Sequence, residues 1–503
     1  MSKYNLLLLS VVALSTIHYT TAQTATDPKP NIIFILSDDL NWGDTEPFGQ
    51  QLIQTPNIAR IAQEGIRFSQ AYAGNSVCAP SRSTLMQGKH PGHARVRDNS
   101  YEGYREALQP GDSTVAQLLK QAGYATGLFG KWGLSNYDQT GLPNDKGFDE
   151  FFGYLNQQHA HNHYPHFLYH NKARVYYPEN GDQYKIEHYG VPNPYNADGQ
   201  VQPLGIDDPA NAKYAFDEYA RKSLDFVREN KDNPFFLFLA YTLPHGNLIV
   251  PELGPYNDKD WPIQFKEWAA MVNRMDTEIG KLLALLEALG IDDNTLIIFA
   301  SDNGNPGQYD KAYPVQAGVP TINKFFNNQS PTRGGKGNTY HGAFHTPALA
   351  RWPKHIAPGQ QSDLVWAFWD FVPTAAELAG VPPLSGTDGI SLVPTLTGEG
   401  IQQQHEFLYW EYQQDQLVRY GNWYARKVNE TQQFELYDLV ADPAQYVDVA
   451  AKHPDVMSRI QAIMASEHQP SDVWPSPGES ERAFHERLKK QQVPPRPKNV
   501  SLY

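Results

Sequence analysis

The feature that most constrains the fold of this chain is the uninterrupted apolar run NIIFIL at residues 31–36. A run without polar alternation is typical of a strand buried on both faces, as in a parallel sheet covered by helices. The run ends in Ser37, Asp38 and Asp39. Ligands of open α/β sheets bind at the carboxyl ends of strands, so this acidic pair occupies a site position. A turn or helix cap is the alternative interpretation of two consecutive aspartates.

A second run of the same kind, NTLIIFA at residues 294–300, ends in Ser301, Asp302, Asn303 and Gly304. Two such strands would bring oxygen-bearing side chains to one edge of the sheet, namely those of Asp38, Asp39, Asp302 and Asn303. Three carboxylates and an amide, without clustered cysteine or histidine, favour calcium or magnesium over zinc. The two runs together predict a site for a hard divalent cation.

Helix and strand signals alternate between these runs, as in a βαβ fold. Helices are predicted at residues 55–66, 113–122, 215–229, 265–289 and 368–380, and further strands at 124–129 and 235–240. We therefore predict an α/β fold in which helices sandwich a large mixed, mostly parallel sheet.

The pattern changes after residue 390. Short antiparallel strands are predicted at residues 407–412, 417–420, 422–427 and 434–437, followed by a helix near 454–466. We expect a catalytic domain over residues 24–390 and a smaller C-terminal α+β subdomain over 391–503. Residues 474–503 are rich in proline and charge, and we expect them to wrap around the surface.

The first 23 residues are typical of a secretory signal peptide. Lys3 gives a charged start, residues 6–14 are mostly apolar, and small residues follow at 20–22. The apolar run is too short to span a bilayer. We therefore expect a secreted or periplasmic protein that has no membrane span after signal cleavage.

Charge bears on the kind of partner. The chain has 41 basic and 55 acidic residues, a formal net charge of -14. This balance argues against broad nucleic-acid binding. An anionic substrate would need a locally basic pocket, and the 17 histidines, 29 tyrosines and 10 tryptophans suit the lining of a sugar site.

Cys78 is the only cysteine of the 503 residues, so it cannot form a disulfide within the chain. An unpaired cysteine is often a small, inert core residue. An arginine nearby, here Arg82, instead favours a reactive thiol. The position of Cys78 alone leaves both interpretations open.

The sequence CAPSR at residues 78–82, followed by STLMQG at 83–88, resembles the signature of the formylglycine-dependent sulfatases, the type I family of the alkaline-phosphatase-like superfamily. In that family a maturation enzyme reads Cys-x-Pro-x-Arg and oxidises the thiol to an aldehyde. The resemblance implies that Cys78 becomes 3-oxoalanine (formylglycine), that its hydrate attacks sulfur, and that Arg82 orients it. It also implies that this group shares one calcium ion with Asp38, Asp39, Asp302 and Asn303.

Three basic residues follow predicted strands or lie in a glycine-rich turn. Lys131 lies in a Gly-Lys-Trp motif, His245 follows Leu243-Pro244, and Lys336 lies in the sequence RGGKG at residues 333–337. Each could be an ordinary surface charge. By resemblance to the family, both lysines contact sulfate, and His245 binds a sulfate oxygen and protonates the leaving alcohol.

The chain departs from the family pattern at two places. Gly133 stands where a histidine often follows Gly-Lys-Trp, and residues 341–343 are His-Gly-Ala where Glu-Gly-Gly is common. The first departure removes a group near the nucleophile. The second is expected to change substrate contacts.

Residues 159–170 contain five histidines. Strand alternation would place His159, His161 and His163 on one face, yet no carboxylate or cysteine nearby supports a zinc site, so a substrate-facing loop is favoured. The arrangement of residues 160–165 resembles sulfatases that share the Lys-Trp-Gly variant, which makes His161 the candidate for the proton acceptor missing at Gly133. Residues 90–99, including Arg95 and Arg97, are expected to form a polar subsite wall.

We therefore predict a sulfuric ester hydrolase that acts on a sulfated carbohydrate. Two alternatives remain open at this point. One is a phosphate or phosphonate monoester hydrolase on the same scaffold, and the other is a binder of sulfated glycans in which Cys78 is not converted.

Overall fold

The computed structural model describes residues 28–100, 105–137, 139–181, 197–200, 211–304, 320–328 and 332–491. The predicted signal peptide, residues 1–23, lies outside the described residues. Among the helices in the described part of the chain, none has the length and apolarity needed to cross a bilayer.

A ten-stranded sheet forms the centre of the molecule, in the order β11-β2-β10-β9-β1-β8-β4-β5-β6-β7. Its five central strands run parallel: β9 (Thr295–Ser301), β1 (Asn31–Asp38), β8 (Phe235–Pro244), β4 (Ala125–Lys131) and β5 (Glu150–Tyr154). The outer strands are β11 (Gln360–Ser362), β2 (Ile66–Phe68), β10 (Ala348–Arg351), β6 (Phe167–His170) and β7 (Ala173–Tyr176), of which β10, β6 and β7 pair antiparallel with their neighbours. The predicted mixed, mostly parallel sheet is confirmed.

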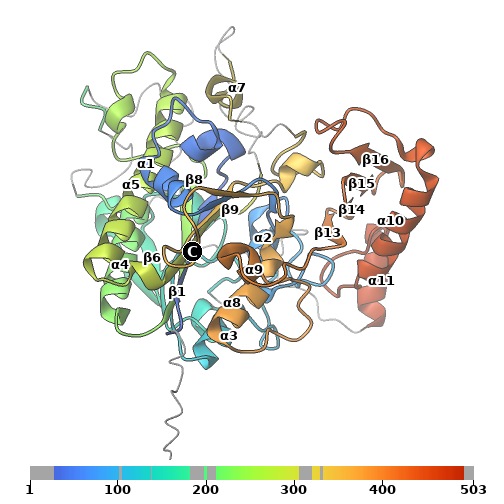
Figure 1. Ribbon diagram of the computed structural model, residues 1–503, viewed down its shortest axis with the longest axis horizontal. Helices are drawn as coiled ribbons and strands as arrows, with labels where there is room; N and C mark the ends of the chain where they lie inside the picture. The colour runs from blue at the N-terminus through green and yellow to red at the C-terminus, as the bar shows by residue number, and fades with distance from the viewer. Residues whose placement is uncertain are drawn as a thin grey trace, which may run out of the picture.

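Helices cover both faces of this sheet (Figure 1). One face packs on α1 (Pro56–Gln63), α4 (Ala215–Asn230) and α5 (Ile263–Ala288), and the other on α2 (Cys78–Gln87), α3 (Val115–Gln121) and α8 (Phe371–Ala379). Successive side chains of β1 alternate between the two cores, with Ile33 and Ile35 in the first and Ile32 and Phe34 in the second. This explains why the run at residues 31–36 contains no polar alternation.

Residues 64–66 do not continue the preceding helix as the sequence predicted. Helix α1 ends at Gln63, and Ile66 already belongs to β2. A Cβ atom at Gly65 would lie 2.0 Å from the carbonyl oxygen of Ala350. The chain therefore turns here, because only glycine permits this close approach to β10.

A separate antiparallel sheet follows near the C-terminus, drawn in orange-red in Figure 1. Its strands are β13 (Phe407–Tyr412), β14 (Asp415–Tyr420), β15 (Trp423–Lys427) and β16 (Phe434–Asp438). Leu408 and Trp410 face the large sheet's side, where they pack with Tyr72, whereas Tyr409 packs on α10 (Pro454–Glu467). The predicted smaller unit with an antiparallel sheet and a helix is confirmed.

Shorter elements complete the described chain: β3 (Ala71–Tyr72), which pairs with β12 (Trp366–Ala367), and helices α7 (Ile322–Phe326), α9 (Val393–Thr397) and α11 (Glu481–Lys490). Helix α11 lies within the segment that composition had suggested would only wrap the surface. Ser480 caps it by accepting a hydrogen bond from the amide of Ala483, and Phe484 is buried. Part of the tail is therefore anchored by a helix.

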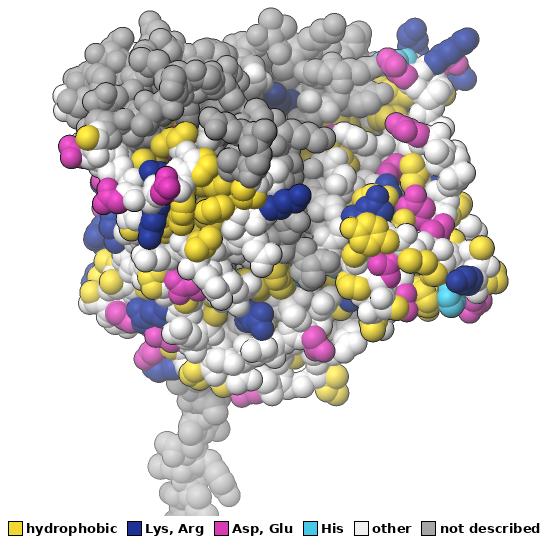
Figure 2. Space-filling model, turned by 90° about the horizontal axis from the view of Figure 1, so that it is seen from above, with side chains coloured by type: hydrophobic (Ala, Val, Ile, Leu, Met, Phe, Trp, Pro, Cys, Tyr) yellow, Lys and Arg dark blue, Asp and Glu magenta, His cyan; other side chains and the backbone are white. Residues whose placement is uncertain are grey.

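Lys, Arg, Asp and Glu side chains are interspersed over the described residues of the face displayed in Figure 2. The described part of this face shows no extended basic area. This distribution agrees with the net negative charge of the chain.

Candidate active site

The carboxyl ends of the parallel strands converge on one buried cluster of charged side chains. Asp38 ends β1, Lys131 ends β4, His245 directly follows β8 and Asp302 directly follows β9. In the sheet register Ser37 lies opposite Ser301, and Asp38 lies opposite Pro244. The structure thus brings together the strand-end residues that the sequence singled out, because parallel strands end at the same edge.

Cys78 opens α2, directly below the acidic end of β1. Its side chain is 2% exposed, and its Sγ atom lies 3.6 Å from Oδ1 of Asp38. Burial raises the pKa of the Cys78 thiol to about 12, against the attraction of Lys131 and Lys336. An unmodified Cys78 would therefore stay protonated at neutral pH, which makes it a poor nucleophile.

Arg82 lies one helical turn after Cys78, so both side chains leave the same face of α2. The guanidinium is fully buried. It donates to Oδ2 of Asp302 at 2.8 Å and to the carbonyl oxygen of Lys131 at 2.7 Å, and lies 3.5 Å from Oδ2 of Asp38. A buried arginine needs such charged partners, and here they tie α2 to three strands.

The two predicted sulfate-binding lysines each contact one of the paired aspartates. Nζ of Lys131 donates to Asp38 at 2.7 Å, and Nζ of Lys336 donates to Asp39 at 2.7 Å. The side chains are 1% and 6% exposed, respectively. The interpretation of these lysines as solvated surface charges is therefore wrong.

The charges of this cluster determine the protonation of its carboxyl groups. Burial works to raise the pKa of Asp38, but Lys131, His245 and Arg82 outweigh it and hold the pKa below its usual range. Lys336 and His245 likewise lower the pKa of Asp39. Burial and the neighbouring charge of Asp38 raise the pKa of Asp302 to about 6. With all groups ionised, three carboxylates face three cations, so an added divalent cation would make the site attractive to an anion.

The donor atoms fit a hard cation such as calcium. Asn303 donates its amide N–H to Oδ1 of Asp39 at 2.8 Å, while its Oδ1 atom is buried without a hydrogen-bond partner among the described residues. One donor atom each from Asp38, Asp39, Cys78 and His245 lies within 4.8 Å of the others. The free oxygen of Asn303 and the carboxylates form the oxygen-rich set that calcium prefers.

Asp302 also positions two other residues of the cluster. One of its oxygens accepts from Arg82, and the other accepts the backbone N–H of Asp39 at 3.3 Å. Asp39 itself adopts a left-handed backbone conformation, with φ 66°, which is uncommon for a residue other than glycine. Such strain at a cluster of charged groups is typical of functional sites.

Two histidine rings border the cluster. The rings of His161 and His245 stack with centroids 4.5 Å apart, and Nε2 of His245 lies 3.5 Å from Oδ2 of Asp39. Burial, reinforced by Lys336, lowers the pKa of His245 to about 4. Burial and the neighbouring His245 place the pKa of His161 well below its usual value. Both rings are therefore neutral near pH 7 and each can accept a proton.

The remaining histidines of residues 159–163 do not share a face. The segment forms a short 3₁₀ helix, His159–His161, so the predicted strand alternation is wrong. The ring of His159 lies edge-on to Tyr154 at 5.0 Å, and His163 contacts the carbonyl oxygen of His245 at 3.0 Å. Among the described residues the three side chains do not bring their ring nitrogens together as a group of metal ligands, which removes the basis for a zinc site.

Gln157 occupies the space beside Gly133, where the sequence lacks a histidine. Gly133 has φ 81°, and a Cβ atom there would lie 2.4 Å from Nε2 of Gln157. Gln157 donates to the carbonyl oxygen of Gly133 at 3.0 Å, and its own Oε1 is buried without a partner among the described residues. Sequence reasoning missed Gln157, because no motif marks it and only the departure at Gly133 hints at a replacement.

The two arginines of residues 90–99, the expected subsite wall, have partners within the protein. Arg97 is buried and donates to the carbonyl oxygens of Gly92 and Gln469 and to Glu411. Arg95 pairs with Asp112 and Glu106. The guanidinium of Arg97 is thus held by internal acceptors, whereas Arg95 keeps 29% of its side chain exposed beside its ion pairs. Contact of these arginines with substrate stays a prediction.

His341 belongs to the departure at residues 341–343 that was expected to change substrate contacts. It is buried, and its Nε2 atom lies 2.7 Å from the hydroxyl of Tyr72. The departure at residues 341–343 therefore changes internal packing at this side chain.

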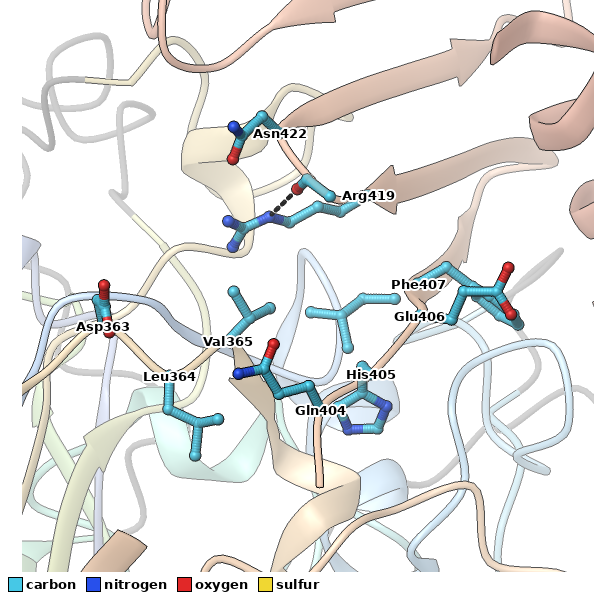
Figure 3. A pocket seen from close by; sticks show the side chains of 11 residues that line it. Asp363, Leu364, Val365, Gln404, His405, Glu406, Phe407, Arg419 and Asn422 are labelled. Atoms are coloured by element: carbon cyan, nitrogen blue, oxygen red, sulfur yellow. Dashed lines mark hydrogen bonds between the residues drawn. The ribbon is translucent and has the colours of Figure 1, made fainter. Parts of the chain in front are cut away.

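A pocket of about 270 Å³ lies at the start of β13, away from this cluster. Asp363 lies on one side of it and Glu406 on the other, and Nε of Arg419 donates to the carbonyl oxygen of Gly421, two residues further along the chain (Figure 3). The described side chains that line this pocket include none of the predicted site residues.

Known proteins resemble this chain over most of its length. Residues 30–381 match the family model described as Sulfatase, and residues 335–469 match one described as N-sulphoglucosamine sulphohydrolase, C-terminal. Human N-acetylgalactosamine-6-sulfatase is 32% identical over 397 residues, which cover 76% of this chain and 68% of the relative. Steryl-sulfatase of Rattus norvegicus is 29% identical over 453 residues, covering 76% and 73%.

A solved structure shows the same architecture. The crystal structure of Ps i-CgsB in complex with k-i-k-neocarrahexaose has a TM-score of 0.70 and 26% sequence identity, and the match covers 93% of this chain and 98% of that chain. The region that matches the Sulfatase model, residues 30–381, includes every strand that delivers a residue to this cluster.

Proposed function

Because this chain belongs to the sulfatase family and is a sulfuric ester hydrolase, we propose that it removes sulfate from a sulfated carbohydrate. We further propose that it does so with formylglycine at position 78 and one calcium ion. The observation that carries the proposal is the placement of Cys78 against Asp38, with Arg82 and Lys131 around both. Residue 78 there faces cations that suit a sulfate group.

Asp38, Asp39, Asp302, Asn303 and residue 78 would hold the calcium ion, which would supply positive charge toward a bound sulfate. Residue 78, once converted to formylglycine, would supply the nucleophilic oxygen.

The side chains of the chain itself have three tasks. Lys131 and Lys336 hold the oxygens of the sulfate through charge-assisted hydrogen bonds, in a buried site where such bonds are strong. Arg82 fixes the start of α2 relative to Asp302, so that residue 78 keeps its orientation. The neutral rings of His245 and His161 handle protons.

His245 lies nearer the aspartates, and we assign it to the leaving alcohol, to which it would pass on the proton that the attacking hydroxyl gives up. His161 stacks on the ring of His245 and is assigned to the proton that must leave residue 78 before the next cycle. With these roles, His245 acts as the general acid and His161 as the general base.

The substrate class rests on the relatives and on composition. One relative is named for an N-acetylgalactosamine sulfate, and Ps i-CgsB was crystallised with an oligosaccharide. The chain is also rich in tyrosine and tryptophan, which suit sugar rings. A sulfated carbohydrate is therefore proposed ahead of a simple aryl ester.

Several further proposals follow from the sequence. The protein is exported through the signal peptide at residues 1–23, and a formylglycine-generating enzyme matures it. Residues 24–390 form the catalytic domain, and residues 391–503 form the C-terminal subdomain.

The test combines peptide mass spectrometry at residue 78 with assays on matched sulfate and phosphate esters. We expect formylglycine in active preparations, hydrolysis of the sulfate ester, and no turnover by Cys78→Ser despite a folded protein. Activity in a preparation that holds only the intact thiol would overturn the formylglycine assignment. Faster hydrolysis of the phosphate ester would favour a phosphate or phosphonate monoester hydrolase.

A further inference from the structure

A second pocket, of about 290 Å³, lies at the end of β13, opposite the end that Figure 3 displays. Its lining includes Asp98, Tyr412, Gln413 and Trp474. The volume is close to the lower limit for small-molecule sites, which suits a single ring-sized group. Its described lining contains none of the charged residues of the active-site cluster.

The walls of this pocket continue directly into the active-site elements. Asn99, next to Asp98, accepts the backbone N–H of Ala79 at 2.9 Å, and Asn75 donates to the carbonyl oxygen of Glu411 at 2.9 Å. A Cβ atom at Gly337, next to Lys336, would lie 3.9 Å from the hydroxyl of Tyr412. A molecule bound at residue 78 would therefore have its neighbouring part beside this pocket.

The pocket lining contains two carboxyl groups, Asp98 and Glu411. Among the described residues Glu411 forms an ion pair and Asp98 does not. The carboxylate of Asp98 accepts a hydrogen bond from the N–H of Asn99 at 2.7 Å and has no ion-pair partner in the described part of the chain. Arg97 points instead to Glu411 at 3.1 Å. Burial raises the pKa of Asp98 to about 7. Such a carboxyl group can accept hydrogen bonds from hydroxyl groups and disfavours a second anion.

The turn that carries Gln413 is held in an unfavourable conformation. Gln413 and Gln414 have φ 47° and 68°, in the left-handed region that glycine or asparagine usually fills in such a hairpin. Gln414 is tied down by donating to the carbonyl oxygens of Ser476 and Glu479. Gln413 donates to the Tyr412 hydroxyl at 3.0 Å and is exposed at the pocket rim. A strained turn that presents an amide to a pocket is typical of a binding loop.

We propose that this pocket binds an uncharged sugar unit next to the sulfated unit, with Asp98 and Gln413 hydrogen-bonding its hydroxyls against the edges of Tyr412 and Trp474. This proposal rests on the proposed function and deepens it. It makes the substrate at least two units long and requires that the neighbouring unit carry no sulfate at this position.

The test compares a one-unit probe with longer probes. Aryl sulfate, κ-neocarratetraose and κ-neocarrahexaose, in which each sulfated galactose is followed by an uncharged unit, are assayed with the wild type, Asp98→Ala and Gln413→Ala. Asp363→Ala, in the pocket of Figure 3, is the matched control. We expect each pocket variant to lower kcat/KM about tenfold for the preferred oligosaccharide, because one or two hydrogen bonds to the substrate are lost. The kcat/KM for aryl sulfate should not change. Asp363→Ala should change neither.

A variant that removes the negative charge of Asp98 tests whether this charge excludes a second sulfate. Asp98→Asn should raise the rate on an oligosaccharide sulfated on adjacent units relative to one sulfated on a single unit. An unchanged ratio would overturn the charge argument.

Three outcomes would overturn the pocket assignment. In the first, the wild type hydrolyses aryl sulfate, and it hydrolyses none of the oligosaccharides faster than aryl sulfate. This outcome would leave the proposed sulfate ester hydrolysis intact. In the second, Asp98→Ala and Gln413→Ala both leave the oligosaccharide rate unchanged. In the third, they lower the aryl rate equally, which would indicate support of the Asn99 contact with Ala79 instead. Failure on every sulfate ester would remove the proposed function as well.

Discussion

The imidazole ring of His161 lies nearly parallel to that of His245, with the ring centroids 4.5 Å apart and an angle of 23° between the planes. Two rings in this contact cannot both carry a positive charge at low energy. Lysines 131 and 336 add further positive charge nearby, and the pKa values of both rings are lowered, principally by burial. The pair, which is neutral near pH 7, can therefore take up at most one proton at a time, so only one of the two rings can act as the acid at any moment.

Replacing His161 by alanine should separate the two product-release steps. We expect normal release of the alcohol in the first turnover and at least tenfold slower release of sulfate, because the proposed proton acceptor is gone. Rapid-quench measurement of both products checks this. His170→Ala is the control, since that side chain is 41% exposed on β6. If both products slow equally, or only KM rises, His161 contacts substrate instead.

Lys131→Met should abolish activity and destabilise the fold. The substitution leaves Asp38 buried without its partner at 2.7 Å, and breaking a buried ion pair costs about 3 to 5 kcal/mol. Chemical denaturation should show this loss of unfolding free energy. Lys172→Met, which removes a lysine that is 55% exposed, should change neither activity nor stability. Retained activity in Lys131→Met would exclude that lysine from sulfate binding.

Calcium removal should lower both activity and melting temperature. The carboxylates of Asp38 and Asp39 and the unpartnered oxygen of Asn303 are the donors that the ion would engage. Asn303→Ala should reduce bound calcium in elemental analysis and weaken its affinity at least tenfold, whereas Asn294→Ala, on a surface turn, should not. Equal calcium content in the two variants would contradict the assignment.

Gly133→Ala should be destabilised by about 1 to 3 kcal/mol, because φ is 81° there and the new Cβ atom would meet the amide of Gln157. The double variant with Gln157→Ala should recover the steric part of this loss and keep the backbone part. Thermal unfolding of the single and double variants separates the two contributions. Fully additive effects would show that Gln157 does not fill this space.

Stability should also depend on pH through His405, which lines the pocket of Figure 3. Burial alone would lower its pKa, but the carboxylate of Asp370 at 2.7 Å outweighs burial and raises it. Because the folded-state pKa exceeds the unfolded value of about 6.5, the stabilisation is fully present below that pH. It is lost as the pH rises through the folded-state pKa.

Denaturant titrations at several pH values check the His405 prediction. His405→Gln should flatten the decline above pH 6.5, whereas His485→Gln, on the exposed face of α11, should leave it in place. An unchanged decline in His405→Gln would place the responsible group elsewhere.

The central sheet could be predicted because its strands carry their own signal. The runs at 31–36 and 294–300 are buried on both faces, so their apolar character does not depend on distant contacts. The residues that follow these strands then meet by topology alone, which explains why Asp38, Asp302 and Lys131 could be grouped from the sequence.

Other features depend on distant contacts that leave no local pattern. The end of α1 is set by the approach of Gly65 to β10, and the space at Gly133 is taken by Gln157. Tyr412 approaches Gly337 because the C-terminal sheet packs beside α2, a relationship that neither segment reveals alone. The internal partners of Arg97 are equally non-local.

Every residue of α2, from Cys78 to Gln87, is buried. In the folded protein no enzyme could lay an extended segment around this thiol in its own active site without first pulling the helix from between the sheet and α8. Any oxidation of Cys78 by a second protein therefore has to occur while the nascent chain is still open. If residue 78 is matured by a second protein, as we propose, chains that fold before this step would keep an unmodified thiol. The active fraction of a preparation would then be set during synthesis.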